Sequence, residues 1–296
     1  MTSASVSRLV LATALLALAC GCGGSPSSPT PPFGSTSGTL TGAGDISVCG
    51  GFGAEATAKL LDSLSGTVFT AGDNVQNVGA RDEYEKCFEP TWGRHKSRIR
   101  PSPGNHDYRT QNGAPYREYF QSVLPPSGQT YYGYDVGGWR ILALDSNIPF
   151  SSGSAQERWL RTELEGNRGK CVLAYWHHPL FSSGSWATPA VQPLWSVLYE
   201  FGVDVVVNGH DHVYERFAPQ DPFGRPDDAR GIRQFTVGTG GATLSGFVGF
   251  AANSQIRDNS TWGVVRFTLR PGSYDWEFIP VSGGSFRDFG TATCSF

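Results

Sequence analysis

The fold of this chain is decided by the stretch Val203-Asp-Val-Val-Val-Asn-Gly-His-Asp-His212, in which an apolar run leads directly into two histidines. Residues 203–207 are mostly β-branched, which predicts a strand buried on both faces of a parallel or mixed sheet. Asn208-Gly209 ends the strand and permits a sharp turn. Residues two apart in an extended loop point the same way, so His210 and His212 can face one point beyond the strand. Ligands of α/β proteins bind at that edge of the sheet.

The two histidines alone are equally compatible with a solvated polar loop, so the other strand ends decide between the two interpretations. Four more predicted strands, within residues 39–45, 67–74, 100–107 and 171–179, also run into polar residues. The side chains at the five ends are Asp45, Asp73, Asn105, His106, His177, His178, His210 and His212. Turns, helix caps and solvated loops explain any one of them. Five such ends together favour a shared site, and carboxylate, amide and imidazole groups suit first-row metal ions.

Helices are predicted between these strands. Residues 54–64, 156–164 and 191–201 have the apolar spacing of helices with one buried face. A strand, a helix and a second strand thus follow one another along the first seventy-odd residues, which is typical of an α/β fold. A further pair of strands is predicted to form a hairpin across Gly137-Gly138.

The last part of the chain predicts a second sheet. Residues 233–237, 263–269 and 274–281 alternate between apolar and polar side chains with period two, which indicates antiparallel strands. We therefore expect one α/β domain over residues 39–296, with two sheets packed face to face and helices outside.

The composition argues against nucleic acid as a partner. The chain has 296 residues, 23 Lys and Arg against 26 Asp and Glu, and a formal net charge of −3. Such a balance provides no basic face for a phosphate backbone.

The N-terminus predicts export. Residues 1–20 contain Arg8 followed by a short apolar run and then Cys20, which is typical of a signal peptide of the lipoprotein type. Lipid at Cys20, or at the competing Cys22, would be the one link to a membrane. Residues 21–38 are rich in Ser, Pro and Gly and predict a tether. We expect an extracytoplasmic protein that is lipid-anchored to the bacterial cell envelope, or secreted.

Four cysteines remain in the body of the chain, and an even number in an exported protein indicates disulfides. Three pairings are open. We favour Cys49–Cys87, which would link segments that follow neighbouring strands, and Cys171–Cys294, which would tie the C-terminal tail to a core strand. The chain has no Cys-x-x-Cys, so a thiolate metal site is not expected.

The motifs at the strand ends resemble those of a known superfamily. They are Gly44-Asp45, Gly72-Asp73-Asn74, Gly104-Asn105-His106-Asp107, Trp176-His177 and Gly209-His210-Asp211-His212. In this order and rough spacing they resemble the calcineurin-like metallophosphoesterases. Gly-His-x-His-x-Tyr-Glu-Arg over residues 209–216 makes the chain most similar to bacterial secreted relatives of purple acid phosphatases. The resemblance implies a four-layer αββα sandwich with a dinuclear metal centre at the carboxyl ends of the strands.

The resemblance also implies which residues bind the metals. Asp73 would bridge two ions, which we expect to be Fe, Zn or Mn. The remaining ligands would be Asp45 and His212 for the first metal, and Asn105, His177 and His210 for the second. Two cations about 3.5–4 Å apart lower the pKa of a bridging water and clamp the phosphoryl oxygens.

Three further residues receive roles without a primary metal bond. The resemblance implies that His106 protonates the leaving oxygen or stabilises charge in the transition state. Asp107 would orient His106 and favour its protonated form. His178 is adjacent to His177, and neighbours in an extended strand point to opposite sides. We therefore expect His178 to support the ligands or to face the substrate, with an additional metal bond as a further possibility.

The sequence departs from the family pattern at the first metal. Purple acid phosphatases carry a tyrosine ligand three residues after the bridging aspartate, and this position is Gln76 here. Other members of the superfamily carry a histidine two residues after the first aspartate, and this position is Ser47. Gln76 is therefore a candidate extra ligand, but it offers only a neutral amide oxygen.

The predicted function is that of an exported, metal-dependent phosphoesterase. A metal-bridging hydroxide would hydrolyse a small-molecule phosphate ester, with an acid phosphatase-like phosphomonoesterase as the first choice. Two alternatives stay open. One is a phosphodiesterase, and the other is a surface lipoprotein that binds metal or phosphate without catalysis.

Overall fold

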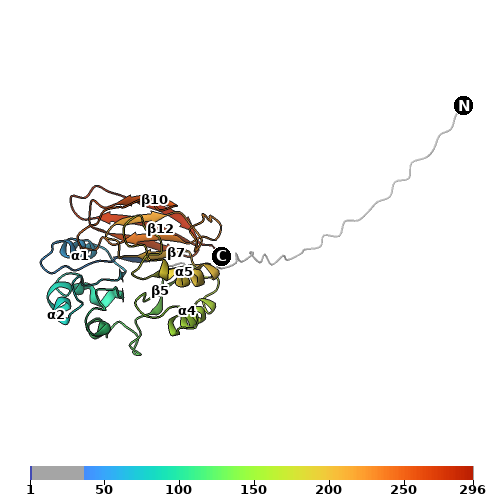
Figure 1. Cartoon of the computed structure of the whole chain (residues 1–296). Coiled ribbons are helices and arrows are strands. Elements are labelled where there is room, and N and C mark those ends of the chain that lie inside the picture. Colours follow the sequence, from blue (N-terminus) through green and yellow to red (C-terminus); the bar gives the residue numbers. More distant parts are fainter. Residues whose placement is uncertain (2–36, 296) are drawn as a thin grey trace, which may run out of the picture. The chain divides into compact units, whose positions relative to one another are not determined.

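The computed structural model describes residue 1 and residues 37–295. Residues 37–295 form a domain with two β-sheets (Figure 1). The predicted signal peptide, Cys20, Cys22 and most of the predicted tether lie outside the described residues. The first sheet has the strand order β13-β12-β11-β1-β2-β3. Its strands are β1 (Gly38–Ala43), β2 (Thr67–Ala71), β3 (Ile99–Ser102), β11 (Gly263–Arg270), β12 (Ser273–Pro280) and β13 (Phe289–Thr293).

The second sheet has the order β10-β8-β9-β7-β6-β5-β4. Its strands are β4 (Tyr132–Val136), β5 (Trp139–Ala143), β6 (Val172–Tyr175), β7 (Val205–Asn208), β8 (Tyr214–Phe217), β9 (Arg233–Val237) and β10 (Ser254–Asp258). The strands β5, β6, β7 and β9 run parallel to one another, as do β1, β2 and β3 in the first sheet. Each sheet therefore gathers the carboxyl ends of several parallel strands at one edge.

Helices cover the outer faces of the sheets. The α-helices are α1 (Gly53–Ser63), α2 (Arg81–Glu83), α3 (Ala114–Tyr119), α4 (Ala155–Glu165) and α5 (Gln192–Glu200). A π-helical turn, η1 (Tyr84–Phe88), continues α2, and three 3₁₀-helical segments are η2 (Trp92–Arg98), η3 (Gln111–Gly113) and η4 (Pro189–Val191). No helix among the described residues is long and apolar enough to span a membrane.

The strand β7 shows why the sheets stack with helices outside. Its side chains alternate between the two faces of the sheet. Val205 and Val207 are buried in the core that also holds Phe69 and Tyr175, whose rings lie 5.2 Å apart across the two sheets. Val206 is buried in a second cluster with side chains of α4 and α5. Because both faces of this strand are buried, it requires apolar side chains at successive positions, which the β-branched run supplies. The predicted αββα sandwich is confirmed.

One prediction about the second sheet is wrong. Residues 233–237 form β9, which pairs in parallel with β7 in the same sheet, with Val205 opposite Arg233. The period-two pattern predicts that this segment lies in one sheet with β11 and β12 as an antiparallel strand, but its antiparallel neighbour is β8, in the sheet that contains β7. Alternation along a short strand shows that the strand has two unlike faces, but it does not show which neighbour it pairs with.

Both favoured disulfides are confirmed. Cys49 and Cys87 are bonded with their Cα atoms 5.2 Å apart, and Cys171 and Cys294 with theirs 5.6 Å apart. The first bond joins the loop after β1 to η1, and the second joins the segment before β6 to the C-terminal tail. Two structural disulfides indicate an oxidising compartment.

Candidate metal centre

Three of the predicted ligands sit in strained backbone turns directly after strands. Asp45, Asp73 and His210 have φ angles of +59°, +48° and +72°, in the left-handed region that residues with a side chain rarely adopt. Such a conformation costs about 1–3 kcal/mol and concentrates at functional sites. The turns follow β1 and β2 of the first sheet and β7 of the second, so strand ends of both sheets deliver their polar side chains to one place.

Glycines in the motifs allow these turns to approach one another closely. A Cβ atom on Gly72 would lie 2.4 Å from Nδ1 of His177. A Cβ atom on Gly104 would lie 2.1 Å from Oδ1 of Asp73. Both distances are too short for any side chain, which is the physical reason that ligand residues follow glycine in this sequence.

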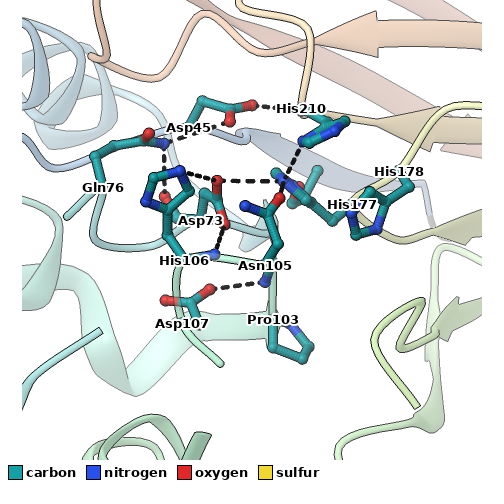
Figure 2. A network of polar contacts seen from close by, with 12 residues as sticks. Asp45, Asp73, Gln76, Pro103, Asn105, His106, Asp107, His177, His178 and His210 are labelled. Atoms are coloured by element: carbon teal, nitrogen blue, oxygen red, sulfur yellow. Dashed lines mark hydrogen bonds and ion pairs between the residues drawn. The ribbon is translucent and has the colours of Figure 1, made fainter. Parts of the chain in front are cut away.

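The predicted ligands of the second metal converge on His177. Its Nδ1 donates to the carbonyl of Ala71 at 3.0 Å, so Nε2 of the neutral ring carries a lone pair. That nitrogen lies 3.0 Å from Oδ1 of Asn105, 3.1 Å from Nδ1 of His210 and 3.3 Å from Oδ2 of Asp73. Four groups that can each act as a ligand therefore face one another, as Figure 2 shows.

The predicted ligands of the first metal are arranged around Asp45. Nδ1 of His212 donates to the carbonyl of Thr243 at 2.8 Å, which turns Nε2 toward Oδ1 of Asp45 at 3.2 Å. Gln76 reaches the same group, with Nε2 3.3 Å from Oδ1 of Asp45. The hydroxyl of Ser47 is buried and has no hydrogen-bond partner among the described residues. Both positions that depart from the family pattern thus lie at this half of the site.

The electrostatics of the site favour positive charge. Burial opposes a proton on His177 and on His212, but the neighbouring carboxylates outweigh burial and raise the pKa of each to about 9. Burial alone would raise the pKa of Asp45, yet His212 and the other histidines hold it well below its ordinary value. His210 differs, because burial and the charge of His177 lower its pKa to about 4.

These residues fit a pair of metal ions. Metal-ligating histidines typically donate their second nitrogen to a backbone carbonyl, as His177 and His212 do here. The carboxylates of Asp45 and Asp73 are almost completely buried, and buried carboxylates require compensating positive charge. Asp73 would be shared between the ions, with Asp45 and His212 on one side. Asn105, His177 and His210 would hold the second ion.

His106 lies on the open side of Asp73 (Figure 2). Its backbone N–H donates to Oδ1 of Asp73 at 2.8 Å, and its Nδ1 donates to the carbonyl of Asn77 at 2.8 Å. These contacts aim Nε2 toward the centre, 3.8 Å from Oδ2 of Asp73. The imidazole is thus positioned beside the predicted metals without belonging to either ligand group.

The structure corrects the prediction for Asp107, which does not contact the imidazole of His106. Its carboxylate is buried and accepts hydrogen bonds from the Tyr84 hydroxyl at 2.5 Å, the Gly104 N–H at 2.8 Å and the Asn74 side chain at 3.0 Å. Desolvation and the charge of Asp73 raise its pKa to about 6. Asp107 therefore ties the turn that carries His106 to the end of β2.

The ring of His178 lies 4.9 Å from that of His177, and nitrogen atoms of His177, His178 and His210 lie close enough together to hold a metal ion. The expectation that His177 and His178 point to opposite sides is wrong, because both lie in a bend after β6 and not in an extended strand. Nδ1 of His178 hydrogen-bonds to the hydroxyl of Ser146 at 2.7 Å, and its ring packs 4.5 Å from the ring of His210. Burial and the two neighbouring histidines lower its pKa well below the ordinary value. This arrangement supports the His210 ring.

Sequence reasoning missed two residues at the rim of the site. Ser146 follows the β5 strand, so the strand-end rule could have found it. Trp186 is 55% exposed and its ring lies 5.6 Å from that of His210. Its loop is held by Asp211, which accepts from the backbone N–H groups of Ser185 and Trp186, both at 3.1 Å. No local pattern marks Trp186, because its loop reaches the site only through this long-range contact.

Comparison with known proteins agrees with this geometry. A family model described as calcineurin-like phosphoesterase matches residues 39–214. Purple acid phosphatase 21 of Arabidopsis thaliana is 28% identical over 241 residues, which cover 65% of this chain and 54% of that protein. The chain spans about half or less of the length of the first curated relatives that it matches.

Two solved structures share the fold. Purple acid phosphatase PPD1 from yellow lupin (Lupinus luteus) seeds matches with a TM-score of 0.74 at 19% identity, covering 90% of this chain and 55% of PPD1. GAP50, the anchor in the inner membrane complex of Plasmodium, matches with a TM-score of 0.66 at 15% identity, covering 87% of this chain and 89% of GAP50. At this identity the two structures support the fold alone.

The family model covers more than half of the chain and includes every predicted metal ligand, from Asp45 to His212. The sheet order and the strand-end site agree with that match. The chain belongs to the calcineurin-like phosphoesterase family.

Proposed function

We propose that the protein is a metal-dependent phosphoesterase that hydrolyses small phosphate esters, with monoesters as its first substrates. The observation that carries this proposal is the position of Asp73. Oδ2 of its buried carboxylate lies 3.3 Å from Nε2 of His177, which belongs to the second ligand group, and 3.8 Å from Nε2 of His106. Asp73 also forms one cluster of possible metal ligands with Asp45 and His177. Two cations bound here would supply positive charge that activates water and neutralises the phosphoryl oxygens.

In the proposed reaction, a water oxygen bonds to phosphorus while the bond between phosphorus and the alcohol oxygen breaks. The departing alcohol oxygen needs a proton, and Nε2 of a protonated His106 would supply it. The hydrogen bond from Nδ1 of His106 to Asn77 fixes the direction of the imidazole for this transfer. Asp107 contributes by holding the turn through the Gly104 N–H. The products are the free alcohol and inorganic phosphate.

Release of nitrophenol tests the proposal. The purified protein is incubated with mono- or bis-(4-nitrophenyl) phosphate and added manganese, zinc or iron. We expect metal-dependent turnover of the monoester that exceeds turnover of the diester. Faster release from the diester would identify a phosphodiesterase. Binding of inorganic phosphate without turnover of either ester would identify a binding protein, and GAP50, described as an anchor, shows that this fold also occurs in a protein with another role.

Metal binding is expected to release protons from His177 and His212. Both have a pKa of about 9, whereas a cation binds only the unprotonated nitrogen. The affinity for the cations should therefore rise with pH up to about 9.

In chelator-treated protein the same pKa shifts of His177 and His212 predict a change in stability with pH. Both values exceed the ordinary histidine value of 6.5, so the protonated rings stabilise the fold below pH 6.5, and this contribution is lost as the pH rises toward 9.

Calorimetry measures this proton release. Titrations of chelator-treated protein with zinc are run at pH 7 in buffers of different ionisation enthalpy. The observed heat should depend on the buffer with a slope that corresponds to one or two released protons per chain. Heats that are equal in all buffers would contradict the prediction.

The metal-loaded protein is expected to show no purple colour. That colour arises from a tyrosine phenolate bound to iron(III), and the corresponding residue is Gln76, whose amide lies 3.3 Å from Asp45. The ligands of the first metal then carry little negative charge, which favours a divalent ion. Visible spectra of the iron-loaded protein check this, and Gln76→Tyr is the matched variant that should gain a visible band. Strong visible absorption of the unmodified protein that dithionite removes would contradict the prediction.

We also propose that the protein is exported and lipid-anchored. The two disulfides support an oxidising compartment. Incorporation of radiolabelled palmitate in a bacterial host tests the anchor, and it should be lost when Cys20 and Cys22 are both replaced by serine. Unchanged labelling of that double variant would overturn the proposal.

A further inference from the structure

A cavity of about 740 Å³ adjoins the metal centre on the side of His212 and Gln76. Its volume is within the range of about 300–1,000 Å³ that holds small organic ligands. The side chains that line its outer part include Val48, Val78 and Ala242. Since His212 belongs to the proposed ligand set, the cavity opens directly onto the place where a phosphate ester would bind.

The walls of the cavity are held in place by hydrogen bonds and a disulfide. The carboxylate of Glu83 accepts from the backbone N–H groups of Val78, Gly79 and Ala80, at 3.2, 2.8 and 3.2 Å. The Cys49–Cys87 disulfide holds the loop that carries Val48. The cavity is therefore formed before a ligand arrives, and such preorganisation reduces the entropy lost on binding.

The lining has a definite chemical character. Val48 and Val78 are 38% and 40% exposed, so each presents an apolar surface to the cavity. The acidic side chains that line it are Asp82, which pairs with Lys86 at 3.3 Å, and Glu83, and no lysine or arginine is among the lining residues in the described part of the chain. The backbone N–H groups compensate the charge of Glu83.

We propose that this cavity binds the uncharged organic group of the phosphate ester, and that Val48 and Val78 determine which alcohols are accepted. The inference rests on the proposed phosphoesterase function and specifies its substrates. They are monophosphates of apolar or uncharged alcohols large enough to fill part of the cavity.

Filling the cavity tests this assignment. In Val78→Trp and, independently, Val48→Trp, the indole occupies the space at a half-exposed position, so the fold tolerates it. We expect kcat/KM for 1-naphthyl phosphate to fall about tenfold, since contacts of one small group are worth that much, while methyl phosphate changes less than about twofold. Val248→Trp, at a 73% exposed position outside the cavity, is the control and should change neither value.

Binding gives an independent readout. Calorimetry with (1-naphthylmethyl)phosphonate should show about tenfold weaker binding to Val78→Trp, with unchanged binding of inorganic phosphate.

The outcomes separate the two proposals. Equal effects of Val78→Trp and Val48→Trp on naphthyl and methyl phosphate, or no effect on either, would overturn the cavity assignment and leave the phosphoesterase function intact. Absence of turnover by the unmodified protein with any of the three metals would overturn the proposed function and, with it, the inference.

Discussion

Replacement of Asp73 by asparagine is expected to remove nearly all phosphoesterase turnover. The carboxylate is buried and lies between the two predicted ligand groups, so its negative charge reduces repulsion between the cations. A loss of about 4 kcal/mol of transition-state stabilisation corresponds to a decrease in kcat/KM of about 10³-fold. The change preserves shape, because Oδ1 of asparagine can still accept from the His106 N–H. Hydrolysis of 4-nitrophenyl phosphate and metal content per chain are the measurements.

Asp288→Asn is the matched control for Asp73→Asn. Asp288 is also a buried carboxylate, but it accepts from Tyr214 at 2.6 Å and Trp276 at 3.1 Å and pairs with Arg216 at 2.7 Å, away from the centre. Loss of this charge should lower the free energy of unfolding while turnover per folded molecule stays unchanged. Retention of more than about a tenth of the activity in Asp73→Asn, with both metals still bound, would refute the shared role of Asp73.

Replacement of His106 by alanine is expected to reduce turnover without removing the metals. A general acid contributes about 10²–10⁴-fold, and His106 is aimed at the centre by its bond to Asn77. The ligand groups around Asp45 and His177 do not include His106, so the metal content should remain at that of the unmodified protein.

The leaving group provides the internal control for His106→Ala. Nitrophenolate departs readily without a proton, whereas the alkoxide of an alkyl phosphate does not. The loss of kcat/KM should therefore be much larger for an alkyl phosphate than for 4-nitrophenyl phosphate. Equal losses for both substrates would show that His106 acts through binding or charge and not as the acid.

The sheet and the ligand groups were predictable because they depend on local rules. A strand buried on both faces requires a β-branched run, and β7 has one. Polar residues after the parallel neighbours β1 and β2 meet at one edge of the first sheet, which brings Asp45 and Asp73 together. His210 joins them from the end of β7 in the second sheet. Each of these strands ends in a tight turn, and the glycines of the strand-end motifs predict those turns.

The remaining features depend on contacts between distant segments. The pairing of β9 with β7 is decided by the path of the chain through β8, which short-range alternation does not encode. The partner of Asp107 is Tyr84 in a π-helical turn, and the loop with Trp186 is placed by Asp211.

Gln76 and Ser47 illustrate what a family resemblance leaves open. The motifs identify the family, but the departures at these two positions lie at the first metal, where Gln76 contacts Asp45 and the Ser47 hydroxyl is buried without a partner. The same side of the centre opens into the cavity with Val48 and Val78. Metal preference and substrate choice are thus expected to diverge together from those of purple acid phosphatases.

Anomalous diffraction from crystals of the manganese- or zinc-loaded protein tests the central claim most directly. The account predicts two peaks about 3.5–4 Å apart, one on each side of the Asp73 carboxylate. One peak would have Asp45 and His212 as neighbours, and the other Asn105, His177 and His210. A single peak, or peaks that do not contact Asp73, would contradict a dinuclear centre in this protein.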